Sequence, residues 1–194
     1  MTDANHTVTE TILGRRSPYV FSDTAISKDE LKALFEAARW APSSYNEQPW
    51  RFIVGQKGDA VYDKILSTLV DANAAWASQA PVLVIAATST RFARNDKENG
   101  HARYDLGQSV ASLALAAWSN GIAVHQMAGF SPDVAAKAFA LPDGTEAVTA
   151  IAIGKVAAPE TLDEDTRQKE QGPRQRRPLS EIVFGKNLDT PIFA

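Results

Sequence analysis

The fold is most clearly indicated by the segment Ala41-Pro42-Ser43-Ser44-Tyr45-Asn46-Glu47-Gln48-Pro49-Trp50. Its prolines fix a non-helical backbone path. Before it, Ser27 and Glu30 form a capping box, and apolar residues follow at helical spacing as far as Ala38. After it, residues 51–55 have the composition of a strand. The segment is therefore predicted to be a rigid loop that joins the first well-marked helix to the first core strand.

On either side of this loop, predicted helices and strands alternate along most of the chain. A short first helix is indicated by Val8, Ile12 and Leu13 and ends near Gly14. Further helices are predicted at residues 59–70, 104–120 and 131–140, and further strands at residues 82–87, 122–126 and 148–153. This pattern is typical of the α/β or α+β class, and it does not show the order of the strands.

Two regions differ from this alternation. The helix at residues 104–120 is apolar on most of its circumference, which predicts burial from several sides, as a central helix or as part of a subunit interface. After Lys155 the chain becomes polar, and only Ile182-Val183-Phe184 regains strand character. We expect residues 156–194 to form an extended arm rather than a second domain.

Composition limits the possible functions. The 194 residues are 44% hydrophobic, which predicts a single domain with one sizeable core. A net charge of −3 gives no basic field that would favour nucleic acid, so we expect a small-molecule partner. The absence of cysteine excludes disulfides, thiolate nucleophiles and sulfur-ligated metals. The start of the chain resembles no signal peptide and no segment is long and apolar enough to span a membrane, so a cytoplasmic protein is expected.

Several catalytic motifs are missing. The 11 glycines include no Gly-x-Gly pair, so neither a dinucleotide fingerprint nor a Walker phosphate loop is present. The histidines His6, His101 and His125 have no metal-ligand spacing, and no Gly-x-Ser-x-Gly elbow occurs. Polar residues in loops between core elements are left as the candidates for binding.

Two such loops are notable, and each has two interpretations. The guanidinium groups of Arg15 and Arg16 beside the Ser17 hydroxyl suit bidentate phosphate binding, but cations are also common at helix ends. Asn46 and Gln48 offer both donors and acceptors, as the edge of a heterocycle requires, but they can equally bind local backbone in a turn.

Together these motifs resemble the nitroreductase family of FMN proteins. The resemblance begins with Arg15-Arg16-Ser17 and Ala-Pro-Ser-Ser-x-Asn-x-Gln-Pro-Trp-Arg-Phe. It continues through Asn73-Ala74-Ala75-Trp76, Ala80-Pro81-Val82-Leu83-Val84, Met127-Ala128-Gly129-Phe130 and Arg174-Gln175-Arg176-Arg177-Pro178-Leu179. It covers residues 7–184. The family fold implies an α+β protein, with a central mixed sheet flanked by helices and a C-terminal arm that reaches the partner subunit.

The resemblance also implies roles for individual residues. Arg15, Arg16 and Ser17 would hold the FMN phosphate and ribityl chain. The proline–serine loop of the partner subunit would lie along the isoalloxazine, through its residues Pro42, Ser43, Ser44, Asn46 and Gln48. Ala128 and Gly129 match the place where backbone N–H groups approach flavin N5 and O4, and glycine permits a close approach. Arg174 and Arg176 match a clamp on the phosphate, with Arg177 as an alternative.

One position departs from the family pattern. Many relatives carry a second basic residue two positions after Arg-Arg-Ser, near flavin N1 and O2, whereas this chain has Pro18 and Tyr19. If Tyr19 contacts the flavin, the loss of a cation predicts a lower reduction potential than in relatives with Lys or Arg.

The implied function is hydride transfer from NADH or NADPH through FMN to a small electron-poor acceptor, such as a nitroaromatic or a quinone. The mechanism would be ping-pong, in a homodimer that holds FMN at its interface. The alternatives are a specialised relative, which acts on an aldehyde, an enone, a halogenated aromatic or flavin itself, and an FMN-binding protein without turnover.

Overall fold

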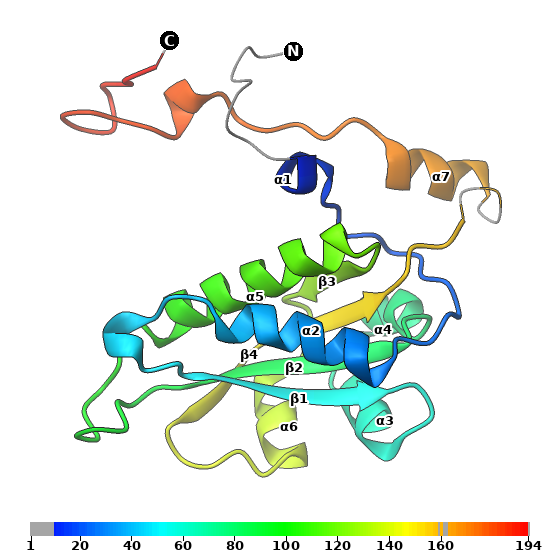
Figure 1. The fold of residues 1–194 in the computed structure, drawn as a ribbon, viewed down its shortest axis with the longest axis horizontal. Helices are drawn as coiled ribbons and strands as arrows, with labels where there is room; N and C mark the ends of the chain where they lie inside the picture. The colour runs from blue at the N-terminus through cyan, green and yellow to red at the C-terminus, as the bar shows by residue number, and fades with distance from the viewer. Residues whose placement is uncertain (1–9, 159, 161–162, 194) are drawn as a thin grey trace. The chain divides into compact units, whose positions relative to one another are not determined.

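A computed structural model describes residues 10–158, 160 and 163–193. The chain divides into two compact units, Met1–Ala158 and Pro159–Ala194, and each is described separately. The first unit contains the sheet and most of the helices (Figure 1). None of the described helices combines the length and the apolar surface that a membrane-spanning segment needs.

The first unit is built on a four-stranded sheet with the order β1-β2-β4-β3. The strands are β1 (Trp50–Gln56), β2 (Val82–Ser89), β3 (Ala123–Met127) and β4 (Thr145–Gly154). All three pairings are antiparallel, and Ile151 of β4 lies opposite Val84 on one side and Gln126 on the other. The α+β class is confirmed, but the described sheet is antiparallel and not mixed. Strands buried on both faces have the same apolar pattern in either direction, so the sequence could not show this.

Helices cover both faces of the sheet. One face packs against α2 (Lys28–Arg39) and α5 (Ala102–Ser119) through Val82, Val84 and Ile151. The other face packs against α3 (Ala60–Leu66), α4 (Asp71–Ala77) and α6 (Pro132–Ala138) through residues such as Leu83 and Ile85. Because successive residues of a strand point to opposite faces, β2 contributes to both cores. The long apolar helix at residues 104–120 is confirmed as α5.

The helix predicted at residues 59–70 is wrong in extent. It ends at Leu66, where the Ser67 and Thr68 hydroxyls donate to the carbonyls of Lys64 and Ile65. These bonds favour a helix end over continuation. A separate helix, α4, follows, and no periodic pattern predicted it because alanines occupy much of its length.

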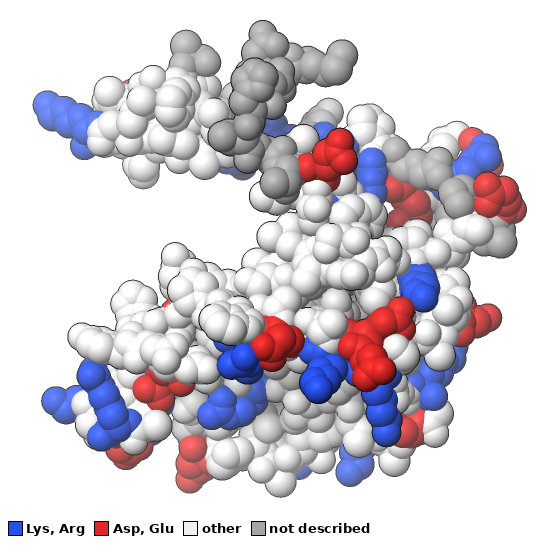
Figure 2. Space-filling model, viewed as in Figure 1, with Lys and Arg blue, Asp and Glu red and all other residues white. Residues whose placement is uncertain are grey.

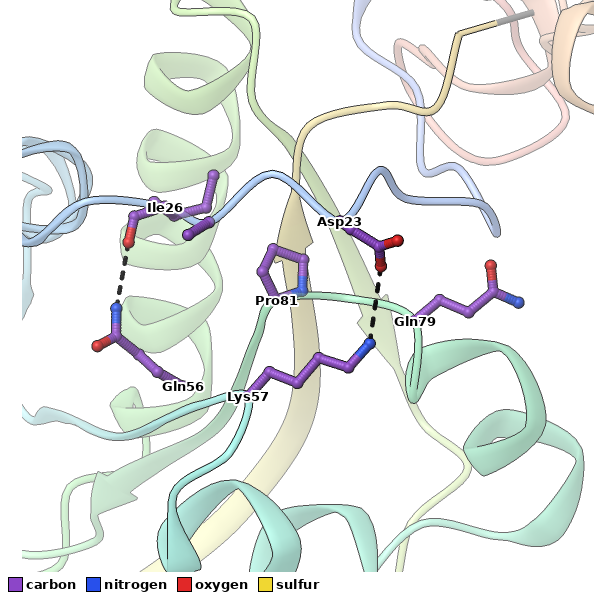
Figure 3. A pocket seen from close by; sticks show the side chains of 7 residues that line it. Asp23, Ile26, Gln56, Lys57, Gln79 and Pro81 are labelled. Carbon is purple, nitrogen blue, oxygen red and sulfur yellow. Dashed lines mark hydrogen bonds and ion pairs between the residues drawn. The ribbon is translucent and has the colours of Figure 1, made fainter. Parts of the chain in front are cut away.

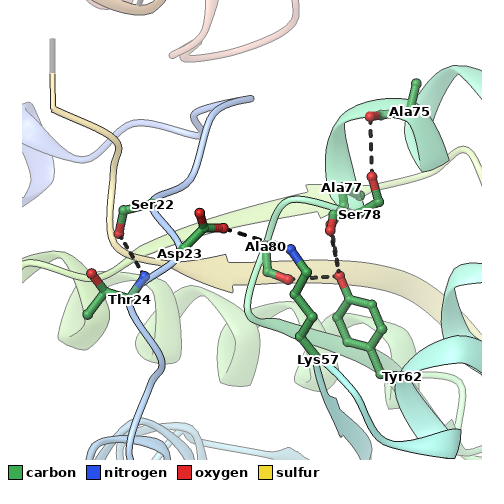
Figure 4. Close-up of polar contacts among 9 residues, drawn as sticks. All are labelled: Ser22, Asp23, Thr24, Lys57, Tyr62, Ala75, Ala77, Ser78 and Ala80. Atoms are coloured by element: carbon green, nitrogen blue, oxygen red, sulfur yellow. Dashed lines mark hydrogen bonds and ion pairs between the residues drawn. The ribbon is translucent and has the colours of Figure 1, made fainter. Parts of the chain in front are cut away.

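The buried Tyr62 joins these two helices (Figure 4). Its hydroxyl donates to the carbonyls of Ala80 at 2.8 Å and Ser78 at 3.1 Å, at and just beyond the end of α4. Burial raises the pKa of Tyr62 to about 12. The hydroxyl therefore satisfies carbonyls that helix geometry leaves without partners.

The second unit contains a helix that was not predicted. Residues Glu164–Gln171 form helix α7, capped by Asp163, whose carboxylate accepts from the Thr166 N–H at 2.9 Å. This helix is polar, so apolar periodicity could not reveal it. The strand predicted at residues 182–184 is wrong: a 3₁₀ turn, Leu179–Glu181, precedes it, and only Phe184 pairs, as an isolated bridge with Pro191.

Near the N-terminus of the chain, α1 (Glu10–Gly14) confirms the first predicted helix, although Val8 lies outside the described residues.

Candidate cofactor site

The Arg15-Arg16-Ser17 motif directly follows α1, which packs against the C-terminal end of α5. A Cβ on Gly14 would lie 2.9 Å from Trp118 Nε1, so the contact leaves no room for a side chain. Arg15 and Arg16 are half-buried, and Arg15 Nη1 donates to the exposed Ser17 hydroxyl at 3.2 Å. A guanidinium and a hydroxyl therefore lie side by side, in an arrangement suited to an oxyanion.

Tyr19 belongs to an aromatic cluster with Trp76 and His125. Its ring meets Trp76 edge-on at 5.1 Å and His125 at 4.7 Å, and the rings of Trp76 and His125 are 4.4 Å apart. His125 Nδ1 donates to the Pro18 carbonyl at 2.8 Å. The Tyr19 side chain is 52% exposed and so is not a core residue. The cluster fixes the chain after Arg15-Arg16-Ser17 against β3 and α4.

The Ala128-Gly129 loop is tied to α4 and to the same cluster. The Gly129 carbonyl accepts from Val70 N at 3.1 Å and from Asn73 Nδ2 at 3.0 Å. Trp76 Nε1 in turn donates to Asn73 Oδ1 at 3.3 Å. Asn73 and Trp76 therefore connect the loop to the segment that carries the arginines. Both residues belong to the motif Asn73-Ala74-Ala75-Trp76, from which no role was predicted for either.

Gly129 is required by the packing of this loop. A Cβ at this position would lie 2.5 Å from Asn73 Nδ2 and 2.9 Å from Val70 Cγ2. Its half-buried backbone N–H has no hydrogen-bond acceptor within the part of the chain that the structure describes. A donor without a partner is thus available beside the cluster.

The proline–serine loop has a constrained backbone. Tyr45, Asn46 and Gln48 have φ values of 53°, 56° and 51°, in the left-handed region that side chains disfavour. The Ser44 N–H donates at 3.0 Å to the carboxylate of Asp105, a residue that is only 2% exposed. Such a strained arrangement persists only where its surroundings hold it in place, and it is often found in functional loops.

Hydrogen bonds within this loop account for part of its polar composition. Gln48 N donates to the Ser43 hydroxyl at 3.0 Å, and Gln48 Nε2 donates to the Asn46 carbonyl at 3.1 Å. The local backbone role that the sequence left open is thus present for Gln48. Asn46 and Pro42 remain exposed.

Helix α5 separates the two groups of candidate residues (Figure 1). Asp105, near its N-terminus, holds the proline–serine loop, and Trp118, near its C-terminus, contacts α1 just before the arginines. At 1.5 Å per residue, these two positions are about 20 Å apart along the helix. Within one chain, therefore, the structure joins Arg15, Tyr19 and Gly129 but does not bring the proline–serine loop to them.

The outward side of α5 between these ends is uncharged. Its residues that are not fully buried include Tyr104, Gly107, Gln108, Ala111, Ser112 and Leu115. Figure 2 shows charged side chains of both signs around α2, whereas the area over α5 is largely free of them. The exposed Arg103 at the start of α5 pairs with Glu146 at 2.6 Å.

Arg174 and Arg176 lie in the second unit and are exposed. Arg176 Nη1 donates to the neighbouring Gln175 carbonyl at 2.8 Å, and Arg177 lies 4.0 Å from Glu181. The two units are not placed relative to each other, so the clamp on the phosphate stays a prediction.

A cavity of about 350 Å³ lies elsewhere in the first unit (Figure 3). It is lined by Asp23, Ala25, Ile26, Gln56, Lys57, Gln79 and Pro81. Lys57 Nζ is 3.9 Å from Asp23; the Lys57 side chain is half exposed and the Asp23 side chain almost fully exposed. None of the candidate cofactor residues lines this cavity, so it is distinct from the candidate site.

Fold and site together define an α+β protein with a divided candidate site, and comparisons with known proteins show its family. The model of the Nitroreductase family matches residues 12–155. A Streptomyces coelicolor protein, provisionally named an NADH dehydrogenase/NAD(P)H nitroreductase, is 26% identical over 167 residues, or 76% of this chain and 82% of that protein.

Solved structures agree with this match. An oxidoreductase containing FMN has a TM-score of 0.87 at 28% identity, over 98% of this chain and 100% of that one. A Desulfovibrio desulfuricans protein, provisionally named a nitroreductase and solved with FMN, has a TM-score of 0.74 at 26% identity, over 94% and 98%. The chain belongs to the nitroreductase family.

Proposed function

We propose that this protein binds FMN and transfers hydride from NADH or NADPH to a small electron-poor acceptor, such as a nitroaromatic or a quinone. The observation that carries the proposal is the connected site in which Asn73, Trp76 and His125 tie the Arg15-Arg16-Ser17 segment to the Ala128-Gly129 loop. The names of matched proteins support FMN and a nicotinamide donor.

The residues present fit FMN. Arg15, Arg16 and Ser17 supply guanidinium and hydroxyl donors for a phosphate, and the Gly129 N–H supplies a donor for an acceptor atom of the ring. Tyr19, whose ring contacts Trp76 and His125, is exposed and presents a phenol rather than a cation. The chain lacks the glycine fingerprint that the adenylate half of FAD commonly uses, which favours FMN.

A homodimer would complete the site. The proline–serine loop lies about 20 Å along α5 from the end that contacts α1. A second copy packed across the uncharged side of α5 would bring its Ser43, Ser44 and Asn46 to the flavin of the first. The C-terminal unit, as part of the same domain, would contribute Arg174 and Arg176.

FMN itself would accept and donate the hydride, so the chain needs no nucleophile. The chain's residues would hold the phosphate, orient the ring through backbone donors, and limit the acceptor by shape. Because donor and acceptor would use the same face in turn, the kinetics would be ping-pong.

The test is the absorbance spectrum of the purified protein before and after anaerobic NADH or NADPH. We expect bound FMN, released on denaturation, and rapid bleaching by at least one donor. A colourless protein that takes up no FMN would overturn the proposal. Stable binding of FMN without bleaching would instead indicate a binding protein without turnover.

Sedimentation tests the dimer separately. We expect a stable dimer at micromolar concentration, and truncation before Arg174 should weaken FMN affinity and dimer stability together. A flavin-loaded monomer would contradict the two-chain site.

A further inference from the structure

An exposed arginine is held over aromatic rings directly beside the proline–serine loop. The guanidinium carbon of Arg94 lies 4.0 Å from the centroid of Tyr45 and 5.2 Å from that of Phe92. The rings of Tyr45 and Phe92 meet edge-on at 5.8 Å. We call these three residues the Arg94 platform. Tyr45 itself lies between Ser44 and Asn46, two of the proposed flavin contacts.

The loop that carries Arg94 is fixed to the proline–serine loop (Figure 1). The Ala93 N–H donates to the Glu47 carboxylate at 2.7 Å. Two further hydrogen bonds span Arg94: Arg91 Nη1 donates to the Asp96 carbonyl at 2.8 Å, and Phe92 N donates to the Lys97 carbonyl at 2.8 Å. The position of Arg94 is thus set by the fold around it.

Stability alone does not explain this arrangement. An exposed cation–π pair contributes less than a left-handed backbone conformation costs at Tyr45, whose φ is 53°. Among the described residues, no carboxylate lies within ion-pair distance of Arg94. By contrast, Arg39, which is also held near an aromatic ring, pairs with Glu36. The Arg94 charge is therefore available to an anion from outside the chain.

We propose that the Arg94 platform binds a phosphate group of the nicotinamide donor, an inference that rests on the proposed function. Every nicotinamide dinucleotide carries a pyrophosphate, and NADPH carries an additional 2′-phosphate. The chain has a net charge of −3, so such an anion gains nothing from the overall field and needs a local cation. A guanidinium over a ring keeps its N–H donors available for phosphate oxygens.

The test compares Arg94→Ala with Lys97→Ala in the FMN-loaded protein. Both substitutions remove one positive charge from the same loop, but no contact joins the Lys97 side chain to Tyr45 among the described residues. Binding of NADP⁺ and NAD⁺, which do not reduce the flavin, is measured by titration. Anaerobic reduction is followed with NADPH, NADH and the phosphate-free donor N-benzyl-dihydronicotinamide.

We expect Arg94→Ala to weaken NADP⁺ binding about ten-fold, equivalent to about 1.4 kcal/mol, and Lys97→Ala to have little effect. Arg94→Lys should be intermediate, because it keeps the charge but loses the planar fork. Rising KCl should weaken NADP⁺ binding to the wild type more than to Arg94→Ala. An equal loss for NAD⁺ would place the contact at the pyrophosphate, and a loss confined to NADP⁺ would place it at the 2′-phosphate.

Two outcomes would refute the inference in distinguishable ways. If Arg94→Ala binds both nucleotides as the wild type does, or if Lys97→Ala weakens them equally, the platform is not a phosphate site, and the proposed function stands. If no donor, including the phosphate-free one, reduces the wild-type flavin, the proposed function fails and this inference fails with it.

Discussion

Replacing Gly129 by alanine tests whether the Ala128-Gly129 loop depends on its contact with α4. The added Cβ would lie 2.5 Å from Asn73 Nδ2 and 2.9 Å from Val70 Cγ2, so these side chains, the loop or α4 must shift. Overpacking of this kind costs about 1–3 kcal/mol, and loss of the Asn73 hydrogen bond adds about 0.5–1.5 kcal/mol. We expect a loss of about 2 kcal/mol in the free energy of unfolding, which lowers Tm by roughly 4–8 °C.

The assay is thermal unfolding of Gly129→Ala at a fixed protein concentration, with Gly100→Ala as the matched control. A Cβ on the exposed Gly100 would meet no atom within 4 Å, so this control should change stability by about 0.5 kcal/mol or less. If both variants unfold at the wild-type temperature, the close contact at Gly129 has no energetic weight and the argument is wrong.

A double substitution separates packing from cofactor binding. Asn73→Ala removes the nearest obstruction, and the remaining one, Val70, is 48% exposed and can move. The variant Asn73→Ala/Gly129→Ala should therefore be about as stable as Asn73→Ala alone, giving a coupling energy of about 1 kcal/mol or more. Should FMN affinity stay low while stability recovers, the flavin also needs the space at Gly129. Strictly additive losses would refute the proposed steric link.

Three further predictions concern the rest of the site and the fold. Arg15→Ala should weaken FMN binding by about 1.5–3 kcal/mol in a fluorescence titration, because it removes a charge-assisted contact; unchanged affinity would return Arg15 to a helix-end role. Tyr19→Arg should raise the flavin midpoint potential by a few tens of millivolts, at roughly 20 mV per kcal/mol of extra stabilisation of the reduced form, and a fall would discard the missing-charge account. Tyr62→Phe should destabilise the protein by about 1–2 kcal/mol near neutral pH. Burial raises the Tyr62 pKa from about 10 in the unfolded chain to about 12 in the folded protein. Between these pH values the folded state keeps the phenol proton that the unfolded state has lost. Stability is therefore full below about pH 10 and falls as the pH rises to 12, and Tyr62→Phe should lack this alkaline loss in a pH series of melts.

Much of the fold could be predicted from local signals. The capping box at Ser27 and Glu30 is observed with both hydrogen bonds, and α5 was predicted by its apolar circumference. Elements without such a signal were missed. Helix α4 is rich in alanine, and α7 is polar and depends on its Asp163 cap. Strand direction depends on contacts between distant segments, so no local pattern could show that the sheet is antiparallel.

The loops of the candidate site could be predicted from the sequence, but the residues that hold these loops in place could not. The motifs marked Arg15 and Ser44, whereas the residues that hold these segments come from far along the chain. The Asp105 carboxylate accepts a hydrogen bond from the Ser44 N–H, 61 residues earlier in the chain. His125 donates one to the Pro18 carbonyl, 107 residues earlier. A buried aspartate in an apolar helix was the signal that could have identified Asp105, because a buried carboxylate needs a hydrogen-bond donor. Nothing local to His125 indicated which carbonyl it would bind.

Helix α5 gives a physical reason why the proposed site needs two chains. Gly14 packs on Trp118 at one end, the Asp105 carboxylate holds Ser44 near the other, and the helix between them sets their separation. Within one chain these two groups of candidate contacts therefore lie at opposite ends of α5 rather than side by side. In a symmetric pair that meets along the uncharged side of α5, each half of the site faces the other half on the partner, and two equivalent sites form. Gly107 and Ala111, both small, would let the two helices approach closely at the centre of that contact. The same helix would then form the interface and set the distance between the parts of each site, so FMN binding and dimer stability should be coupled in this protein.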